Sequence, residues 1–388
     1  MRISGTYAIS TTLGESVQAF VPHPLPPIKP VLAPKCFVEA NRVAELALAR
    51  LSGVSGLFPS VDWLLYSAIR KEALLTSQIE GTQATLADLF DEEAGFAVSN
   101  TDDVEEVTNY LRAFRLVQNN LRDENGLPLS VRLLCDAHRL LLDGARGHGK
   151  QPGELRRSQN RIGGTRPDSA VLGAVFVPPP PERVPTLLED LERFIHDKEN
   201  ASQALPPLVK TALVHVQFET IHPFLDGNGR IGRLLIAALL EHWGLLPQPL
   251  LYVSGYLKQH QAEYYRRLSN VRTEGDWEGW VAFFLEGVSV AALHAERNIV
   301  AIASLLAADR RKLLASPKAG PASYRLSEML PMMPRFNVEQ VRQKLGTSFP
   351  TANAAVKVLQ DLGIVTEQTG LKKNRSYGYA GYIASLAS

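Results

Sequence analysis

The sequence predicts an all-α body followed by a small C-terminal unit that mixes helices and strands. Apolar residues recur at helical spacing in several segments of this 388-residue chain, and 45% of its residues are hydrophobic, enough for a sizeable core. Towards the C-terminus the pattern changes to helix, turn, second helix and short strand. These observations predict one large helical domain and a smaller second domain.

The composition is typical of an ordinary soluble protein. The formal net charge of +1 argues against a strong general attraction to nucleic acid or to membranes. Cys36 and Cys135 are far apart and lack metal-site spacing, so we expect free thiols in a reducing cytoplasm. The N-terminal stretch MRISGTYAISTTLGES has one basic residue and no apolar core, and the apolar run at residues 234–240 is too short to span a bilayer. Neither a signal peptide nor a membrane span is therefore expected.

The predicted elements follow in chain order. Residues 1–35 are rich in proline and polar residues, and their stretch PHPLPPIKP predicts an extended arm lying on the body. Amphipathic periodicity predicts helices at residues 39–51 and 61–81, the second ending at Gly81. Further helical patterns follow at residues 104–122, 130–143 (with a capping signal at Ser130), 211–221, 233–243 and 294–314.

The sequence HPFLDGNGRIGR, residues 222–233, lies between two of these predicted helices. Backbone N–H groups of residues 227–229 can converge on an anion, because glycine reaches conformations closed to larger residues, and the next helix directs its positive end there. Arg230 and Arg233 share a helix face, so each could bind a different phosphate. The turn is therefore predicted to bind phosphate groups.

Two further residues of the turn complete its chemistry. Asp226 is a hard oxygen ligand placed where a magnesium ion bridging two phosphates would bind. His222 is the titratable group free to act as a base near neutral pH. A lone His-Pro pair is usually a turn, and a lone Asp-Gly-Asn-Gly is usually a loop or a cation-binding turn. The combination predicts a phosphate site with a base beside it.

This motif resembles HPFx[D/E]GNGRxxR, the signature of the Fic family, and matches it at every required position. Fic enzymes typically move AMP from ATP to a hydroxyl of a target protein and release pyrophosphate. The resemblance implies a Fic-type helical domain at residues 36–305 that uses ATP with Mg²⁺ or Mn²⁺. It implies that His222 is the base that deprotonates the target hydroxyl and that Asp226 is the metal ligand. Arg230 would bind the β-phosphate and Arg233 the γ-phosphate. The full set of implied nucleotide-binding residues is Gly227, Asn228, Gly229, Arg230, Ile231, Gly232 and Arg233.

An upstream hexapeptide, TSQIEG at residues 76–81, resembles the Fic inhibitory motif [S/T]xxxE[G/N]. The resemblance implies that Thr76 opens the motif and that Glu80 pairs with Arg233, so that ATP cannot seat its γ-phosphate. Competition between Glu80 and the γ-phosphate for the Arg233 guanidinium is sufficient to restrain the reaction, because a buried ion pair strengthens in low dielectric. On the hexapeptide alone, Glu80 would be a solvated residue beside a C-cap glycine. The order of the motifs is similar to the Fic class with an N-terminal inhibitory helix.

Two more assignments depend on the same resemblance. Residues 144–184 are a long glycine- and proline-rich stretch, and a loop of this length is usually functional. The resemblance implies a β-hairpin flap at about residues 156–178, which lines up a target segment by strand addition. It also places Tyr264 at the edge of the adenine base, with a core aromatic as the alternative. The implied flap residues are Ile162, Gly163 and Gly164.

The C-terminal part is predicted to be a separate unit. Residues 306–323 are a predicted linker, and residues 324–388 resemble a winged helix whose second helix follows Pro350 as a recognition helix would. Residues 306–388 carry twelve Lys and Arg against five Asp and Glu, a net charge of +7 that leaves −6 for the rest. Nucleic acid and protein are both open as partners of this unit.

The function predicted from the sequence is a cytoplasmic protein adenylyltransferase that acts on a Ser, Thr or Tyr hydroxyl, itself included, and is restrained by Glu80. Its partners would be ATP and a target protein, with no membrane, and a homodimer is an open alternative. Rival functions are phosphoryl transfer from inverted ATP, removal of AMP with Glu80 orienting a water, and a DNA-binding regulator that senses ATP. Gly229 favours adenylylation because it leaves room for the β-phosphate.

Overall fold

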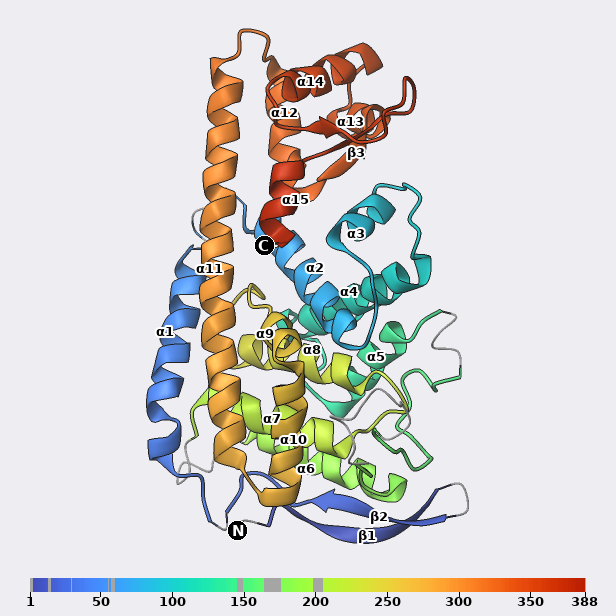
Figure 1. Ribbon diagram of the computed structural model, residues 1–388, viewed down its shortest axis with the longest axis vertical. Helices are drawn as coiled ribbons and strands as arrows, with labels where there is room; N and C mark the ends of the chain where they lie inside the picture. Colours follow the sequence, from blue (N-terminus) through green and yellow to red (C-terminus); the bar gives the residue numbers. More distant parts are fainter. Residues whose placement is uncertain are drawn as a thin grey trace.

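Two consecutive helices, α7 (Pro207–Ile221) and α8 (Asn228–His242), lie at the centre of the body and are joined by the HPFLDGNG turn (Figure 1). α7 is buried on almost every side because apolar residues occupy all of its faces. This computed structural model describes residues 3–12, 15–28, 30–54, 56, 60–144, 149–163, 176–197 and 205–387.

The other helices surround this pair. α6, α10 and α11 pack against α7, while α2, α4 and α5 pack against α8. The bounds of these and the remaining helices are α1 (Val38–Val54), α2 (Val61–Ile79), α3 (Leu86–Glu93), α4 (Thr101–Arg122), α5 (Val131–Leu141), α6 (Val184–His196), α9 (Ser254–Gln259), α10 (Gln261–Glu274), α11 (Trp277–Ala315), α12 (Pro321–Met329), α13 (Val338–Leu345), α14 (Phe349–Asp361) and α15 (Ala380–Ala387).

The mainly helical prediction is confirmed. Every segment with a predicted helical pattern forms a helix, and most ends differ by a few residues. The exception is the pattern at residues 294–314, which is the second half of α11, a helix that begins at Trp277. The Ser130 side chain caps α5 by accepting a hydrogen bond from the Leu133 N–H, as the sequence indicated.

The long helix α11 spans the length of the molecule beside α1 (Figure 1). It is the one helix in the described ranges that is long and apolar enough to cross a membrane by length and composition alone. Its contacts with α1, α7, α9, α10, α12 and α15 are those that a core helix makes. α11 also corrects the predicted linker: the helix continues to Ala315 and α12 begins at Pro321, so the connection is residues 316–320 rather than 306–323. Apolar residues on the last turns of α11, such as the buried Leu313, extend its helical pattern into the predicted linker.

The predicted N-terminal arm is a β-hairpin. Strands β1 (Gly5–Thr12) and β2 (Glu15–Pro22) pair antiparallel, with Gly5 opposite Pro22 and Thr12 opposite Glu15. The β-branched and aromatic residues before Pro22 favour these strands, while the extended-arm prediction rested on the proline-rich stretch that follows them. The hairpin does lie on the body, since Phe20 N–H donates to Val177 O at 2.9 Å.

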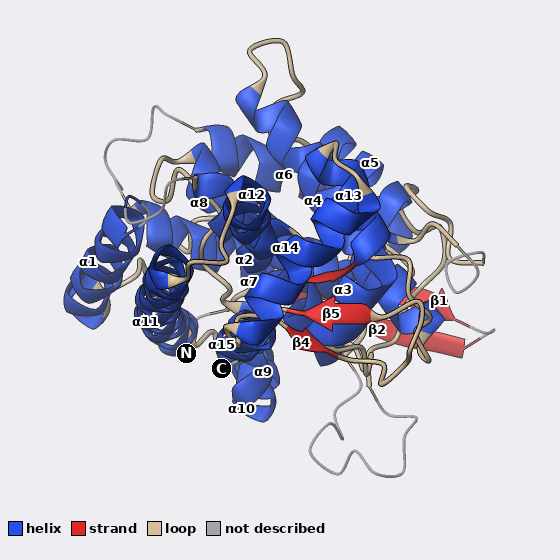
Figure 2. Cartoon of the chain, turned by 90° about the horizontal axis from the view of Figure 1, so that it is seen from above, coloured by secondary structure: helices blue, strands red, loops and turns tan. Residues whose placement is uncertain are grey.

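The C-terminal region places α12, α13 and α14 beside a three-stranded antiparallel sheet in the order β3 (Arg335–Asn337), β5 (Ser376–Gly378), β4 (Thr366–Glu367). Seen from above, this region sits over the end of the helical body that contains α2 and α3 (Figure 2). Arg335 pairs with Asp91 of α3 at 3.2 Å, and Gln340 donates to Ala94 O at 2.8 Å. The winged-helix interpretation of this region stays a prediction.

Candidate active site

The signature turn is held in one conformation by its own residues. His222 ends α7 at φ 51° and Gly227 precedes α8 at φ 75°, both in the left-handed region. The Asn228 side chain closes the turn, because its Oδ1 accepts from Phe224 N–H and its Nδ2 donates to Phe224 O, each at 2.8 Å. Asn228 therefore shapes the turn with its amide, and backbone N–H groups remain to face an anion.

His138 of α5 supports the same turn from below, a role that the sequence did not indicate. Its ring is fully buried and stacks on Phe224 with ring centroids 3.8 Å apart. Nδ1 accepts from Gly153 N–H at 2.9 Å, so Nε2 carries the proton and donates to Asp226 O at 3.0 Å. Burial lowers the pKa of His138 to about 4, which keeps this tautomer neutral.

The candidate base, His222, is partly buried at the junction of α7 and the turn. Its carbonyl accepts from Arg156 Nε at 2.8 Å, which fixes the backbone at this point. Burial, followed by the charges of Arg272 and Arg156, lowers the pKa of His222 to about 3. The imidazole is therefore unprotonated at neutral pH, as a general base must be.

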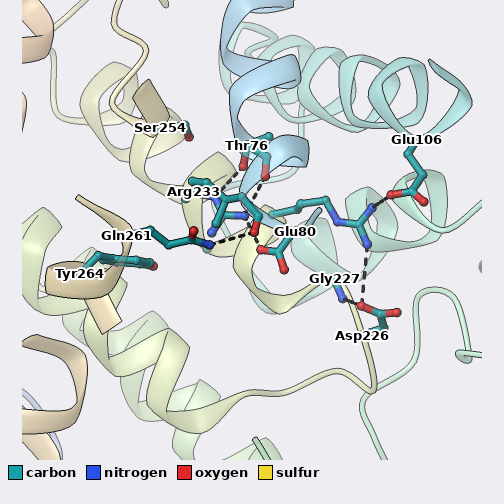
Figure 3. A network of polar contacts seen from close by, with 12 residues as sticks. Thr76, Glu80, Glu106, Asp226, Gly227, Arg233, Ser254, Gln261 and Tyr264 are labelled. Atoms are coloured by element: carbon teal, nitrogen blue, oxygen red, sulfur yellow. Dashed lines mark hydrogen bonds and ion pairs between the residues drawn. The ribbon is translucent and has the colours of Figure 1, made fainter. Parts of the chain in front are cut away.

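Arg233 is 1% exposed and is held by the end of α2 (Figure 3). Its Nε donates to Thr76 Oγ1 at 2.6 Å, and its Nη2 donates to Thr76 O at 3.2 Å and to Glu80 Oε1 at 2.5 Å. The structure thus brings together the three residues of the predicted inhibitory contact. The same end of α2 is tied down by Lys258, which donates to Gln78 Oε1 at 2.7 Å, and by Gln261, which donates to Ile79 O at 3.1 Å.

The Glu80 carboxylate lies directly over Gly229. A Cβ added at Gly229 would lie 2.4 Å from Glu80 Oε1 and 2.9 Å from Arg233 Nη1. A carboxylate oxygen therefore occupies the space over the first turn of α8 that backbone N–H groups and a guanidinium make favourable for an anion. The glycine is what allows this close approach.

Arg230 is also paired in this structure. Its Nη1 lies 3.0 Å from Glu106 Oε2 of α4, and its side chain is 6% exposed. The two arginines thus pair with different carboxylates: Arg230 with Glu106, and Arg233 with Glu80, the pair that the inhibitory motif predicted.

Asp226, the predicted metal ligand, lies just before Gly227 with its side chain half exposed. Its Oδ1 accepts from Gly227 N–H at 2.6 Å and lies 3.8 Å from Arg230 Nη2, while Oδ2 lies 4.0 Å from Lys150 Nζ. No group of three His, Cys, Asp or Glu that could hold a metal occurs in the described part of the chain. A single carboxylate is compatible with Mg²⁺, which binds through one or two carboxylates together with phosphate oxygens and waters, and the metal assignment stays a prediction.

Three residues predicted to bind nucleotide have buried positions. Tyr264 is 1% exposed and its hydroxyl is 2.9 Å from His215 Nε2, which agrees with the core-aromatic alternative that the sequence left open. Ile231 is fully buried, and Gly232 allows α8 to approach α7, because a Cβ there would lie 2.5 Å from Glu219 Oε1. The helical periodicity of α8 explains why Ile231 and Gly232 face the core, because only one face of the helix turns to the site. The neighbouring Tyr265 is partly exposed and hydrogen-bonds Gln261.

The predicted flap is described at its two ends. Ile162 and Phe176 exchange two backbone hydrogen bonds, at 2.8 and 2.9 Å, and Gly163 has φ 85°. Gly164 lies outside the described residues. Phe176 contacts Phe20 of the N-terminal hairpin and lies 3.8 Å from the Arg272 guanidinium. The flap base is therefore packed between the hairpin and α10.

Comparison with known proteins gives two matching family models. The Fic/DOC family N-terminal model matches residues 38–119 and the Fic/DOC family model matches residues 128–240, together half of the chain. Similar curated proteins are the protein adenylyltransferase Fic of Drosophila ananassae, 28% identical over 54% of this chain and 38% of the fly protein, and a probable protein adenylyltransferase of Aquifex aeolicus, 40% identical over 20% of this chain and 23% of that protein. The chain spans less than half the length of these relatives.

Solved structures share the fold. A Fic family protein from Desulfovibrio desulfuricans matches with a TM-score of 0.58 at 21% identity, over 90% of this chain and 97% of that chain. Fic-1 from C. elegans matches with a TM-score of 0.51 at 20% identity, over 68% of this chain and 71% of that chain. With the matching family models and the geometry of the turn, these findings identify the chain as a Fic domain protein of the Fic/DOC family.

Proposed function

We propose that this protein is an adenylyltransferase that transfers AMP from ATP to a hydroxyl of a target protein and is held in a resting state by Glu80. The observation that carries the proposal is the Glu80 carboxylate, bound by Arg233 at 2.5 Å over Gly229. A negatively charged group already occupies this position, which supports the turn as a site for phosphate. The names of the curated relatives support the same activity.

The proposed reaction uses residues in distinct positions. His222, neutral because burial lowers its pKa, accepts the proton of the target hydroxyl as that oxygen bonds to the α-phosphorus. The bond from the α-phosphorus to its bridging oxygen breaks, and pyrophosphate leaves. Backbone N–H groups of the turn and the Arg230 and Arg233 guanidinium groups stabilise the negative charge that develops. Mg²⁺, held by Asp226, would supply further charge neutralisation on the phosphates.

The resting state follows from competition for Arg233. Glu80 accepts a hydrogen bond from Nη2 of Arg233, and Thr76 accepts hydrogen bonds from Nε and Nη2 of the same guanidinium. A γ-phosphate needs the same guanidinium, so the nucleotide must displace Glu80 to bind in the reactive orientation. Removing one partner of a buried ion pair leaves the other charge without compensation, so substitution of Glu80 should change the Arg233 site strongly.

Incubation with ATP labelled at the α-phosphate tests the proposal. We expect the Glu80→Gly variant to label protein, itself included, at least tenfold faster than the wild type. In the Glu80→Gly background, His222→Ala should reduce labelling about 10²-fold or more, as expected for loss of a general base. Mass spectrometry should find an AMP adduct on a Ser, Thr or Tyr.

Three outcomes would contradict it. Labelling that persists in the His222→Ala variant would remove the base from the mechanism. A phosphate adduct instead of AMP would indicate phosphoryl transfer, and loss of AMP from a modified protein would indicate the reverse reaction.

A further inference from the structure

Arg230, in the first turn of α8, is held by a carboxylate from another helix. Its Nη1 donates to Glu106 Oε2 of α4 at 3.0 Å, and its side chain is 6% exposed. Its Nη2 lies 3.8 Å from Asp226 Oδ1, and Figure 3 draws both contacts as dashed lines. Its Nε is buried and has no hydrogen-bond partner among the described residues. The guanidinium is therefore held through Nη1 and keeps a buried donor unused.

The helix that carries Glu106 is itself firmly packed. Val107 and Tyr110 of α4 are fully buried in the core. Asn109, one turn after Glu106, donates from Nδ2 to Asp143 O at 2.6 Å, which ties α4 to the segment that follows α5. Glu106 therefore extends from a fixed backbone and joins α4 to the first turn of α8.

Glu106 differs from Glu80 in its position relative to the turn. The three atoms nearest to a Cβ added at Gly229 belong to Glu80 and Arg233. Glu106 is not among these neighbours and contacts Arg230 instead. The Glu106 carboxylate thus compensates a buried guanidinium charge without filling the space over the turn.

We propose that Glu106 is a positioning residue for Arg230 in the nucleotide site. Nε and Nη2 form one edge of the planar guanidinium, which a phosphate group can engage through two hydrogen bonds. With Nη1 held by Glu106, this edge is presented to the nucleotide in a fixed orientation beside Asp226, the proposed metal ligand. This role rests on the proposed function and deepens it, because Glu80 restrains the site whereas Glu106 orders it. Loss of the two carboxylates should therefore have opposite effects on nucleotide binding.

Titration with ADP and with AMP separates this role from a general loss of structure. In the Glu80→Gly background with Mg²⁺, calorimetry should show that Glu106→Ala weakens ADP binding about tenfold or more, because a small displacement of a positioned group is costly. AMP lacks the β-phosphate that Arg230 would bind, so its affinity should be unchanged. Glu106→Gln keeps an oxygen that can accept from Nη1 and should lose less. Glu105→Ala is the matched control: it removes an exposed carboxylate from the neighbouring position of α4 and should leave both affinities unchanged.

A double-mutant cycle with Arg230 completes the test. Once Arg230→Met has removed the guanidinium, a further Glu106→Ala change should not alter the ADP affinity. Unchanged or tighter ADP binding in Glu106→Ala, or an equal loss for ADP and AMP, would overturn the positioning role and leave the proposed function intact. If the Glu80→Gly parent binds no ADP, the proposed function fails and the role of Glu106 fails with it.

Discussion

At Gly229, one missing Cβ makes room for the Glu80 carboxylate and, in the proposed function, for a phosphate oxygen in its place. The Glu80 oxygen lies 2.4 Å from where a Gly229 Cβ would be, so no other residue at position 229 admits a charged oxygen there. The space is bounded by Arg233, which binds the carboxylate at 2.5 Å. A phosphate oxygen and a carboxylate oxygen have similar size and charge, and this similarity underlies the proposed competition.

The first prediction concerns the substitution of His138. In His138→Phe, the stacking on Phe224 remains, but Gly153 N–H and Asp226 O lose their partner, at about 1–3 kcal/mol for each group. Urea unfolding should show this loss. In the Glu80→Gly background, the Mg²⁺ concentration for half-maximal labelling should also rise, because Asp226 loses its anchor. His138→Gln can replace one donor and one acceptor and should lose less; equal stability of all three proteins would contradict the role given to His138.

Among the helices, α2 combines the contact with Arg233 with an unusual buried charge pattern. Its C-terminal end holds Arg233, while three consecutive charged residues in its middle, Arg70, Lys71 and Glu72, are each less than 8% exposed. Glu72 receives hydrogen bonds from Ser254 at the start of α9. Burial raises the pKa of Glu72 to about 7, so this carboxyl is about half protonated near pH 7 and mostly protonated at lower pH.

The stability of α2 should therefore depend on pH through Glu72. The folded-state pKa is raised above the unfolded value, so its contribution is fully present below about pH 4.5 and is lost as the pH rises through 7. Glu72→Gln imitates the protonated form. Its free energy of unfolding should exceed that of the wild type at pH 8, by up to about 3 kcal/mol, and the gain should shrink towards pH 5. A variant that is weaker than the wild type by the same amount at both pH values would contradict a raised pKa.

The sequence predicted these helices and their contact well because short patterns determine them. Helical spacing placed α2, α7 and α8, and the motifs at both ends of the Glu80–Arg233 pair fixed which side chains would meet. Tyr264 was misplaced because its neighbour Tyr265 is equally aromatic, and only packing against His215 and Trp280 decides which ring is buried. His138 was not recognised as a support because its partners are backbone groups, which leave no trace in the sequence.

Across the whole molecule, the N-terminal hairpin packs against residues more than 150 positions away. Phe20 is 4% exposed, contacts Phe176 at the base of the flap and donates its N–H to Val177 O. This contact with the flap cannot be read from local periodicity, whereas the hairpin itself is a local pairing of residues 5–12 with residues 15–22. The linker was placed too early because its first residues, 306–314, also belong to the helical pattern at residues 294–314, and α11 continues to Ala315.

The hairpin should contribute to the position of the flap. Phe20→Ala should cost about 3–5 kcal/mol in urea unfolding, because a buried aromatic is lost. Labelling of protein in the Glu80→Gly background should fall while the affinity for ATP stays the same. Tyr7→Ala is the matched control: Tyr7 contacts Phe20 but is 61% exposed, so its loss should cost under about 1 kcal/mol. Equal effects of the two substitutions would contradict a role for the buried ring.

The central claim is that the turn at residues 222–233 orients a triphosphate and that Glu80 stands in its place. A crystal structure of the Glu80→Gly variant with a non-hydrolysable ATP analogue and Mg²⁺ tests it most directly. We predict the α-phosphorus opposite His222, the metal on Asp226 and the γ-phosphate on Arg233. A turn without nucleotide in this variant, or a nucleotide bound with its γ-phosphorus facing His222, would contradict the account.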